Sequence, residues 1–523
     1  MNNTLTAIID QLTRLGLAPD ELQAHEQLLS RAISEQRKAS FKIIDTCRFD
    51  NGSMLTLPPA ADLKSDWAEG YIAFVLAAGA ASRYSQPLHH LSCALEDKNH
   101  PDIVSSLESL AHEGALTWPL PQQLATLVSA PAKANALSAK DCERLSEEIH
   151  LPKALMPCVR EGTSFLELKH LEHLKLRGLS GELFVTPPGK TAAFSSALAA
   201  ANTHHQKPSP LESRFLEQGP ALSTIRFHRD GSPVLDPNGE PSVVPAGHGA
   251  IAKLFPTTRQ LFPTSDALFI RNIDNIMGTG SAAIAATAAF LSLHRQLLTG
   301  VRAIRAALAK QQIEVAAASA ETILRQFLPA SAPMPAITLS SGPVAALWRL
   351  QASLFHTPLN KPLTDDYLRE LFARPVNLMG QVPNIHNDVG GTPCFIDAPN
   401  GGAPVKISLE LPHVSGTDRK QFLENSLIAT HFNPGFCAVE IPQEADYYSK
   451  QNRDFWLMAE KVYRGEQVVY YETVLYELLG NSSFANTVFV EVPRLVFNPH
   501  KALRDAMNQS LNGWLDSPSQ SHP

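Results

Sequence analysis

The sequence predicts an α/β protein built around a mixed sheet. Three observations support this fold class: short apolar segments of strand length recur along the chain, helical patterns lie between several of them, and small residues follow the first one. The chain has 523 residues, of which 44% are hydrophobic, so it can bury a large core.

Composition excludes several classes of function. The chain has 44 lysines and arginines against 51 aspartates and glutamates, without a long run of either sign, so we expect no nucleic-acid partner. Its six cysteines are widely spaced and form no CxxC pair, which indicates reduced thiols and not a disulfide framework or zinc site. Small-molecule chemistry or protein partners are favoured.

No segment is typical of export or of a membrane protein. The first residues, MNNTLTAIIDQ, lack the basic start and apolar core of a secretory signal. The longest apolar stretch, 282–293, is shorter than the ~18 residues that cross a bilayer. We therefore expect a cytoplasmic protein without a membrane partner.

The chain opens with a region that we expect to be helical, residues 1–65. Apolar residues recur there at spacings of three and four before a glycine: Leu5, Ile8, Ile9, Leu12 and Leu15. The segment YIAFVLA, 71–77, is apolar on both faces and predicts the first buried strand of a core at 66–330. Residues 89–150 have a polar helical pattern, which we interpret as an insertion.

Further strands are predicted from apolar, β-branched segments between helical patterns. They are 181–186, 223–227, 267–272, 405–411, 435–441 and 487–492. We expect residues 331–514 to form a C-terminal part that completes the substrate site. The tail, 515–523, is predicted to be disordered.

The first strand runs into the small-residue turn FVLAAGAASRY, residues 74–84. Without large side chains, backbone N–H groups can approach a phosphate closely, and an arginine nearby can hold its oxygens. The candidate binding residues are Leu76, Ala77, Ala78, Gly79 and Ala80, with Arg83 as the cation. The alternative is a closely packed turn with a surface arginine.

A second segment, LPKALMPCVREGTSFLEL at 151–168, follows the insertion. The pair LAAGAASRY and PKALMP resembles the LxGGxGTRL and PKxxxP signatures of sugar-nucleotide pyrophosphorylases. The resemblance implies a Rossmann-like, GT-A-like nucleotidyltransferase fold, in which Arg83 and Lys153 bind the phosphates of both substrates. The chain departs from that pattern at Ala81, where the family has glycine, and in the length of the insertion.

Two more segments resemble UDP-sugar pyrophosphorylases. VPAGHGAI, 244–251, is similar to their PPGHGD-type loop, which implies nucleotide contacts by Gly247, His248 and Gly249. FIRNIDNIMG, 269–278, is similar to their NxDN strand end, which implies that Asn272 contacts the nucleotide and that Asp274 holds Mg²⁺. A carboxylate at the carboxyl end of a strand suits an α/β site. The alternatives are a turn histidine and an Asx-turn or helix cap.

A fourth match lies near the end of the chain. TVFVEVPRLVFNPHKALRDAM, 487–507, resembles the FxPVKxxxDL segment of the same enzymes and implies that Lys501 reaches a substrate phosphate. The alternative is a solvated lysine on a helix. A closer resemblance, on GAASR, the GHGA loop, NIDN and the segment 374–396, is to a bacterial family with no assigned activity.

Together these segments predict a metal-dependent nucleotidyltransferase that joins a nucleoside triphosphate and a sugar phosphate and releases pyrophosphate. The attacking phosphate is already anionic, so no general base is required, and Arg83, Lys153, Lys501 and Mg²⁺ on Asp274 would align and neutralise the phosphates. One alternative is a non-catalytic sensor of nucleotide sugars or an assembly protein on the same fold. Another is a glycosyltransferase, which would normally have a DxD motif where this chain has NIDN.

Overall fold

A computed structural model describes most of the chain. The described residues are 2–17, 22–23, 41–58, 67–79, 86–112, 122–149, 152–159, 161–204, 211–236, 238–278, 280–328, 342–385, 390–398, 401–415, 430–444, 447–448, 457–463, 465–500, 505 and 510–511. The chain divides into two units. Unit 1 comprises 1–63, 218–270 and 289–493, and unit 2 comprises 64–217, 271–288 and 494–523.

Unit 2 contains a parallel sheet with the strand order β3 (Tyr71–Leu76), β4 (Gly181–Thr186), β5 (Ser213–Glu217). Parallel neighbours require crossover connections, which α7 (Phe165–His173) and α8 (Thr191–His204) provide. Every residue of β4 is buried, as expected for a parallel strand that is covered on both faces.

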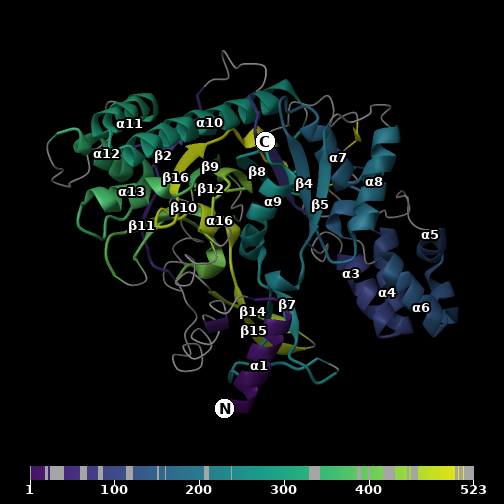
Figure 1. The fold of residues 1–523 in the computed structure, drawn as a ribbon. Helices are drawn as coiled ribbons and strands as arrows, with labels where there is room; N and C mark the ends of the chain where they lie inside the picture. The colour runs from purple at the N-terminus through teal and green to yellow at the C-terminus, as the bar shows by residue number, and fades with distance from the viewer. Residues whose placement is uncertain are drawn as a thin grey trace. The chain divides into compact units, whose positions relative to one another are not determined.

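Residues 86–149 of unit 2 contain helices and no strand in their described part. They are α3 (Gln86–Glu96), α4 (His100–His112), α5 (Gln122–Ser129), the 3₁₀ helix η2 (Pro131–Ala136) and α6 (Ala139–Ile149). Figure 1 shows these helices together in dark blue. Their buried side chains, such as Leu91, Leu107 and Leu145, belong to one hydrophobic cluster with Val75 of β3.

The larger sheet of unit 1 is mixed. Its strand order is β2 (Met54–Thr56), β16 (Asn486–Glu491), β9 (Val376–Pro383), β13 (Phe436–Glu440), β8 (Ala267–Asn272), and β12 (His431–Phe432) also pairs with β9. β16 is parallel to β9 and β2, whereas β13 is antiparallel to β9. The last two residues of β8 belong to unit 2.

A helix covers this sheet closely at one glycine. A Cβ on Gly380 of β9 would lie 2.8 Å from the ring of Phe436 and 3.4 Å from that of Phe290. Phe290 belongs to α10 (Ser281–Ala309), and its ring packs on Phe436 with centroids 4.7 Å apart. The absence of a side chain at Gly380 therefore allows α10 to pack against the strand.

The other elements of unit 1 form smaller layers. A second sheet has the order β1 (Ile43–Thr46), β10 (Thr392–Ile396), β11 (Val405–Leu409), and two hairpins are β6 (Ser223–Ile225) with β7 (Val243–Pro245) and β14 (Leu457–Tyr463) with β15 (Glu466–Glu472). The remaining helices are α1 (Asn2–Arg14), η4 (Pro220–Leu222), η5 (His248–Leu254), α9 (Phe255–Leu261), α11 (Ile313–Phe327), α12 (Val344–Leu350), the π-helix η6 (Gln351–Phe355), α13 (Asp365–Ala373), η7 (Leu411–His413) and α16 (Leu475–Leu479).

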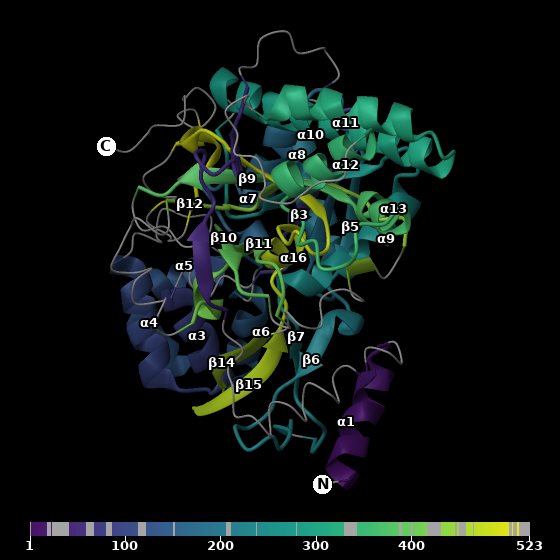
Figure 2. The same cartoon turned by 90° about the vertical axis from the view of Figure 1, so that its left-hand side faces the viewer.

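Helix α1 packs on the hairpins of unit 1. Its buried Ile8 and Leu12 contact a cluster that includes Phe227 and Val469. Figure 2 shows α1 beside the β6–β7 hairpin.

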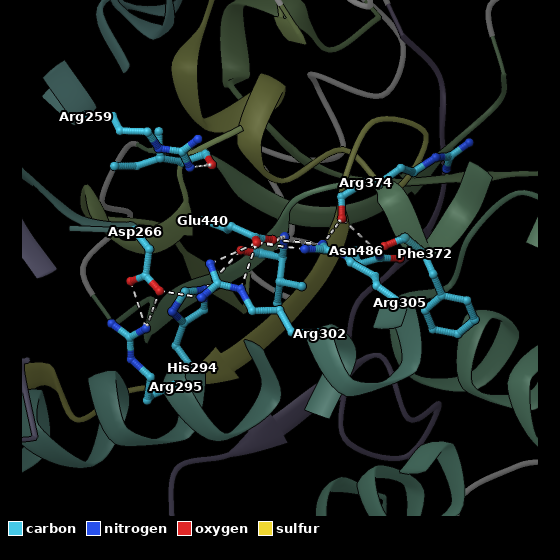
Figure 3. A network of polar contacts seen from close by, with 12 residues as sticks. Arg259, Asp266, His294, Arg295, Arg302, Arg305, Phe372, Arg374, Glu440 and Asn486 are labelled. Atoms are coloured by element: carbon cyan, nitrogen blue, oxygen red, sulfur yellow. Dashed lines mark hydrogen bonds and ion pairs between the residues drawn. The ribbon is translucent and has the colours of Figure 1, made fainter. Parts of the chain in front are cut away.

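A network of arginines and carboxylates holds α10 at one edge of the unit 1 sheet (Figure 3). Asp266 precedes β8, and Glu440 ends β13, next to the first residue of β9. Arg295 and Arg302 of α10 bind Asp266, and Arg302 and Arg305 bind Glu440. The network therefore lies at the amino ends of β8 and β9, opposite the edge where α/β folds bind ligands, and we assign it to stability.

The predicted α/β class with a mixed sheet is confirmed. All seven predicted strands are present, and residues 1–65, which we expected to be helical, also contain β1 and β2. The unit boundaries differ from the predicted division at 330, because residues 289–493 pack with 218–270 in unit 1. The predicted tail, 515–523, is outside the described residues. In the described part of the chain, none of the helices has the length and apolar character needed to cross a membrane.

Candidate functional site

Lys153 lies in unit 2, in the loop that precedes α7 and contacts the small-residue turn. It begins the 3₁₀ helix η3 (Lys153–Leu155), and its backbone N–H donates to the carbonyl of Gly79 at 3.3 Å. On the other side, the N–H of Phe165, the first residue of α7, donates to the carbonyl of Met156 at 3.1 Å. The small-residue turn and the Lys153 loop, which the sequence predicts to bind phosphate, are thus directly hydrogen-bonded to each other.

The side chain of Lys153 joins two further candidate segments. Its Nζ lies 3.3 Å from Oδ2 of Asp274 and 2.9 Å from the carbonyl oxygen of His500, to which it donates. The ammonium also lies 5.2 Å from the centre of the Phe165 ring. The side chain of Lys153 is 11% exposed and that of Asp274 is 40% exposed, so the pair is accessible to a ligand mainly from the Asp274 side.

His500 is held by a buried cysteine. Its Nδ1 lies 3.0 Å from the carbonyl oxygen of Cys158 and 3.2 Å from Sγ of the same residue. Its backbone N–H donates to the carbonyl of Asp274 at 3.1 Å. Burial raises the pKa of the Cys158 thiol well above its usual range, so Cys158 is a protonated structural group and not a nucleophile.

A buried ionic triad lies under the Asp274 turn. Lys169 and Glu172 of α7 and Arg271 of β8 are completely buried, and Glu172 binds Lys169 at 3.2 Å and Arg271 at 2.7 Å. Both cations also donate to the carbonyl of Asn275, Lys169 at 2.5 Å and Arg271 at 3.1 Å. The Met277 N–H donates to Glu172 at 3.1 Å. The triad thus binds the backbone directly after Asp274.

Burial and the neighbouring Arg271 lower the pKa of Lys169 to about 8, against the opposing effect of Glu172. Lys169 is therefore mainly protonated at neutral pH. The triad then carries two positive charges and one negative charge.

The small-residue turn is only partly described. Leu76 accepts a hydrogen bond from the Ile273 N–H at 3.3 Å, and Ala77 donates to Val185 at 3.0 Å. Ala78 is half-buried and Gly79 is exposed, with open space where a Cβ would lie. Asn272 is half-buried at the end of β8, two residues before Asp274. Three predicted site residues are outside the described residues: Ala80, Arg83 and Lys501.

In unit 1, the loop of Gly247, His248 and Gly249 packs on residues 472–475. The Gly249 N–H donates to the carbonyl of Thr473 at 2.8 Å, and the Thr473 N–H donates to Ala246 at 2.9 Å. Gly247 has φ +80°, and a Cβ on it would lie 2.5 Å from atoms of Glu472 and Thr473. A Cβ on Gly249 would lie 2.6 Å from Thr473. Internal packing thus requires both glycines, independently of any ligand.

His248 has a structural partner on each side of its ring. The N–H of Leu475, the first residue of α16, donates to its Nδ1 at 3.0 Å, so His248 caps that helix and carries its own proton on Nε2. Nε2 lies 3.5 Å from Oε1 of Glu410. The side chain is still 33% exposed, so one part of the ring remains open to a ligand.

The described residues do not form a complete metal site. No group of three or more histidines, cysteines, aspartates or glutamates among them is placed to hold an ion. Asp274 offers a half-exposed carboxylate, whose Oδ2 binds Lys153. Such a carboxylate fits Mg²⁺ that arrives with a triphosphate, because Mg²⁺ takes most of its ligands from phosphates and water.

One polar cluster in unit 1 was not identified from the sequence. Gln381 of β9 is completely buried, and both atoms of its amide lack a hydrogen-bond partner among the described residues. It pairs in register with Glu491 of β16, whose carboxylate binds Nε2 of His431 at 2.7 Å. A glutamine in the apolar segment VNLMGQVP was the available signal, but only the structure shows that it lies at the carboxyl end of a buried strand.

The comparisons with known proteins give one family model and several solved structures. A domain of unknown function (DUF4301) matches residues 344–511. UDP-glucose pyrophosphorylase from Leishmania major, solved as a point mutant in complex with UDP-glucose, matches with a TM-score of 0.50 and 12% identity, over 96% of this chain and 78% of that chain. The chain is therefore similar in fold to UDP-glucose pyrophosphorylase.

A second structure of the Leishmania major UDP-glucose pyrophosphorylase, a different point mutant with UDP-glucose, matches with a TM-score of 0.47 and 12% identity. It covers 97% of this chain and 78% of that chain. No curated protein matches the chain. The similarity to UDP-glucose pyrophosphorylase thus concerns the fold, and the reaction has to be argued from the site.

Proposed function

We propose that the protein is a nucleotidyltransferase that transfers a nucleotidyl group from a nucleoside triphosphate to a sugar phosphate and releases pyrophosphate. One observation carries the proposal. Lys153, Asp274 and His500, from three segments that resemble pyrophosphorylase motifs, contact one another in unit 2. Their contact next to Gly79 supports the proposal, because it brings a cation and a carboxylate together beside the turn that is predicted to bind phosphate.

In the proposed reaction, a phosphate oxygen of the sugar phosphate attacks the α-phosphorus of the triphosphate. A new P–O bond forms, the bond between the α-phosphorus and the bridging oxygen to the β-phosphorus breaks, and pyrophosphate leaves with the electron pair. No proton has to be removed from the nucleophile, so the reaction needs no general base. It needs cations that bind the phosphates, and Lys153 is such a cation among the described residues.

Lys153 has two roles in this proposal. Before substrate binds, its ammonium neutralises Asp274 and keeps that carboxylate in place. When the triphosphate enters, Lys153 donates to phosphate oxygens and stabilises the charge that develops on them. Asp274 would hold Mg²⁺, which when bound neutralises phosphate charge.

Five other residues keep the roles that the resemblance implies. Arg83 and Lys501 are proposed to bind phosphate. His248, with Gly247 and Gly249, is proposed to contact the nucleotide through the exposed part of its ring.

The proposal is tested by incubating the purified protein and Mg²⁺ with each nucleoside triphosphate and a panel of sugar 1-phosphates, and by measuring pyrophosphate. We expect release with one preferred pair, together with an equal amount of nucleotide sugar. Binding of a nucleotide sugar without any release would instead favour the sensor. Neither binding nor release with any pair would contradict both functions.

A further inference from the structure

The buried triad of Lys169, Glu172 and Arg271 has no role in the chemistry proposed above. It lies in unit 2, and all three side chains have no exposed surface. Buried ion networks often contribute little net stability, because the cost of removing charges from water offsets their attraction. Apolar residues of similar size would fill the same volume, so the position of the triad calls for another explanation.

The hydrogen bonds of the triad converge on the turn that carries Asp274. The carbonyl of Asn275 accepts from Lys169 and from Arg271, and the Met277 N–H donates to Glu172. Three hydrogen bonds to buried charges thus fix the backbone one to three residues after Asp274. Hydrogen bonds to charged groups are stronger than neutral ones, and burial strengthens them further.

The same turn is also fixed from its other side. The side chain of Asn275 accepts from the Asn498 N–H at 2.9 Å, and the carbonyl of Asp274 accepts from the His500 N–H at 3.1 Å. The side chain of Asp274 itself is held by the ammonium of Lys153. The backbone of the turn is therefore fixed on both sides, while the carboxylate of Asp274 is half-exposed and has Lys153 as its partner.

Helix α7 connects this triad to Lys153. The helix begins directly after the Lys153 loop, with a capping box between Ser164 and Glu167, and its buried face presents Lys169 and Glu172 to the turn. One rigid element therefore fixes the position of Asp274 relative to Lys153.

We propose that Lys169 is a positioning residue, which holds the turn of Asp274 through the carbonyl of Asn275 so that Asp274 and Lys153 face the same phosphate. This inference rests on the proposed function for the identity of that phosphate. Lys169 also gives the triad its excess positive charge, since Glu172 and Arg271 alone would be neutral.

Lys169→Met is the appropriate test. It removes one charge and two hydrogen bonds, those to Glu172 and to the carbonyl of Asn275, yet leaves Glu172 paired with Arg271, and Asn275 still accepts from Arg271. No buried group loses its last partner, so we expect the variant to fold. Lys175→Met, on the exposed surface just after α7, is the matched control.

The first measurement is amide hydrogen exchange of the full chain by mass spectrometry, which does not depend on any substrate. We expect peptides that contain Met277 to exchange at least tenfold faster in Lys169→Met than in wild type or Lys175→Met. Equal exchange would overturn the inference, because the turn would then be fixed without Lys169.

The second measurement is turnover in a double-mutant cycle with Asp274→Asn. We expect Lys169→Met to lower kcat at least tenfold in wild type and to have little further effect in Asp274→Asn, since the lysine acts through that turn. Unchanged kcat, or equal losses in both backgrounds, would overturn the positioning role.

The two failures are distinguishable. If Lys153→Ala and Asp274→Asn keep full turnover, or if no turnover is found, the proposed function is wrong, and hydrogen exchange still decides whether Lys169 holds the turn. If both variants are impaired while Lys169→Met is not, the proposed function stands and the inference is wrong.

Discussion

Lys153 and Asp274 form an ion pair, with 3.3 Å between Nζ and Oδ2, although 121 positions separate them in the sequence. Each is held by backbone contacts of its own: Lys153 through Gly79, and Asp274 through His500. The pair thus joins a cation and a carboxylate at a preorganised place.

Replacing Lys153 by alanine should lower turnover by about 10²-fold, because loss of one preorganised charge donor costs ~3 kcal/mol in the transition state. The fold should persist, since Asp274 is 40% exposed and can be solvated. Steady-state kinetics of Lys153→Ala and of the exposed control Lys140→Ala test this. A wild-type rate for Lys153→Ala would show that the site lies elsewhere.

Replacing Asp274 by asparagine should remove the Mg²⁺ dependence of nucleotide binding. Without metal, the carboxylate repels a triphosphate and occupies Lys153, so the variant should bind nucleotide without Mg²⁺ at least as tightly as wild type. Calorimetric titrations with Mg²⁺ and with chelator, on both proteins, measure this. Equal nucleotide affinities in all four titrations would show that Asp274 does not hold Mg²⁺.

Glu440→Gln should destabilise the protein by about 3 kcal/mol, because it removes the charge that Arg305 binds, whereas Arg302 keeps Asp266 as a partner. Glu440 is nearly buried and binds both Arg302 and Arg305 (Figure 3). Urea unfolding measures the difference, with Glu321→Gln on the exposed face of α11 as the control. A loss no larger than that of the control would contradict the assigned role.

The effect of Glu440 should depend on pH. Burial raises the pKa of Glu440, but the hydrogen bonds and charges of Arg305 and Arg302 lower it by more. The net pKa lies below the usual range of a glutamate. A carboxylate with a lowered folded-state pKa stabilises above its unfolded pKa and loses this contribution as pH falls through the folded value. The difference between wild type and Glu440→Gln should therefore shrink below about pH 4.

Lys406 of β11 should make the stability of unit 1 depend on pH above neutrality. It is completely buried, and its Nζ donates to the carbonyls of Thr487 at 2.8 Å and Leu354 at 3.3 Å. Burial lowers its pKa to about 7. The unfolded chain therefore binds a proton that the folded protein lacks between about pH 7 and pH 10.

Wild type should thus gain stability relative to Lys406→Met as pH rises, by up to about 1.4 kcal/mol for each pH unit above 7. Urea unfolding of both proteins at pH 7, 8 and 9 measures the difference. A difference that does not change with pH would show that Lys406 stays charged in the folded protein across this range.

Cys93 should be the cysteine that reacts in the native protein. Of the six free cysteines it alone is exposed, and the other five are buried. A thiol reagent should therefore label one cysteine in buffer and six in denaturant, and Cys93→Ser should abolish the native reaction. Rapid labelling of further cysteines in Cys93→Ser would contradict the described packing.

Local sequence pattern was sufficient for seven strands, including β3, β4 and β8, because each is a short apolar segment between turns or helices. It missed β9, in which Gly380, Gln381 and Pro383 interrupt the apolar pattern. Gly380 is explained only by the rings of Phe436 and Phe290 against it. These are contacts between distant segments, which a local pattern does not contain.

For the candidate site, the sequence predicted the residue types and their places at the ends of strands and in turns. It also predicted that Lys153 and Asp274 act together, but only through resemblance to a family. That they contact each other, and that His500 joins them, required the structure. The roles of Gly247 and His248 in packing on residues 472–475 were likewise absent from the pattern, since those residues lie more than 200 positions away.

The sequence by itself determined the α/β class, the positions of seven strands along the chain and the candidate polar residues, because these follow from periodicity and short motifs. The tertiary structure alone decided which polar side chains are buried. On α7, Lys169 and Glu172 face the Asp274 turn, while His170 and His173 bind Glu182 of β4 at 2.6 and 2.7 Å. Four polar residues on a short helix are usually solvated, and they are buried here because distant segments supply their charge partners.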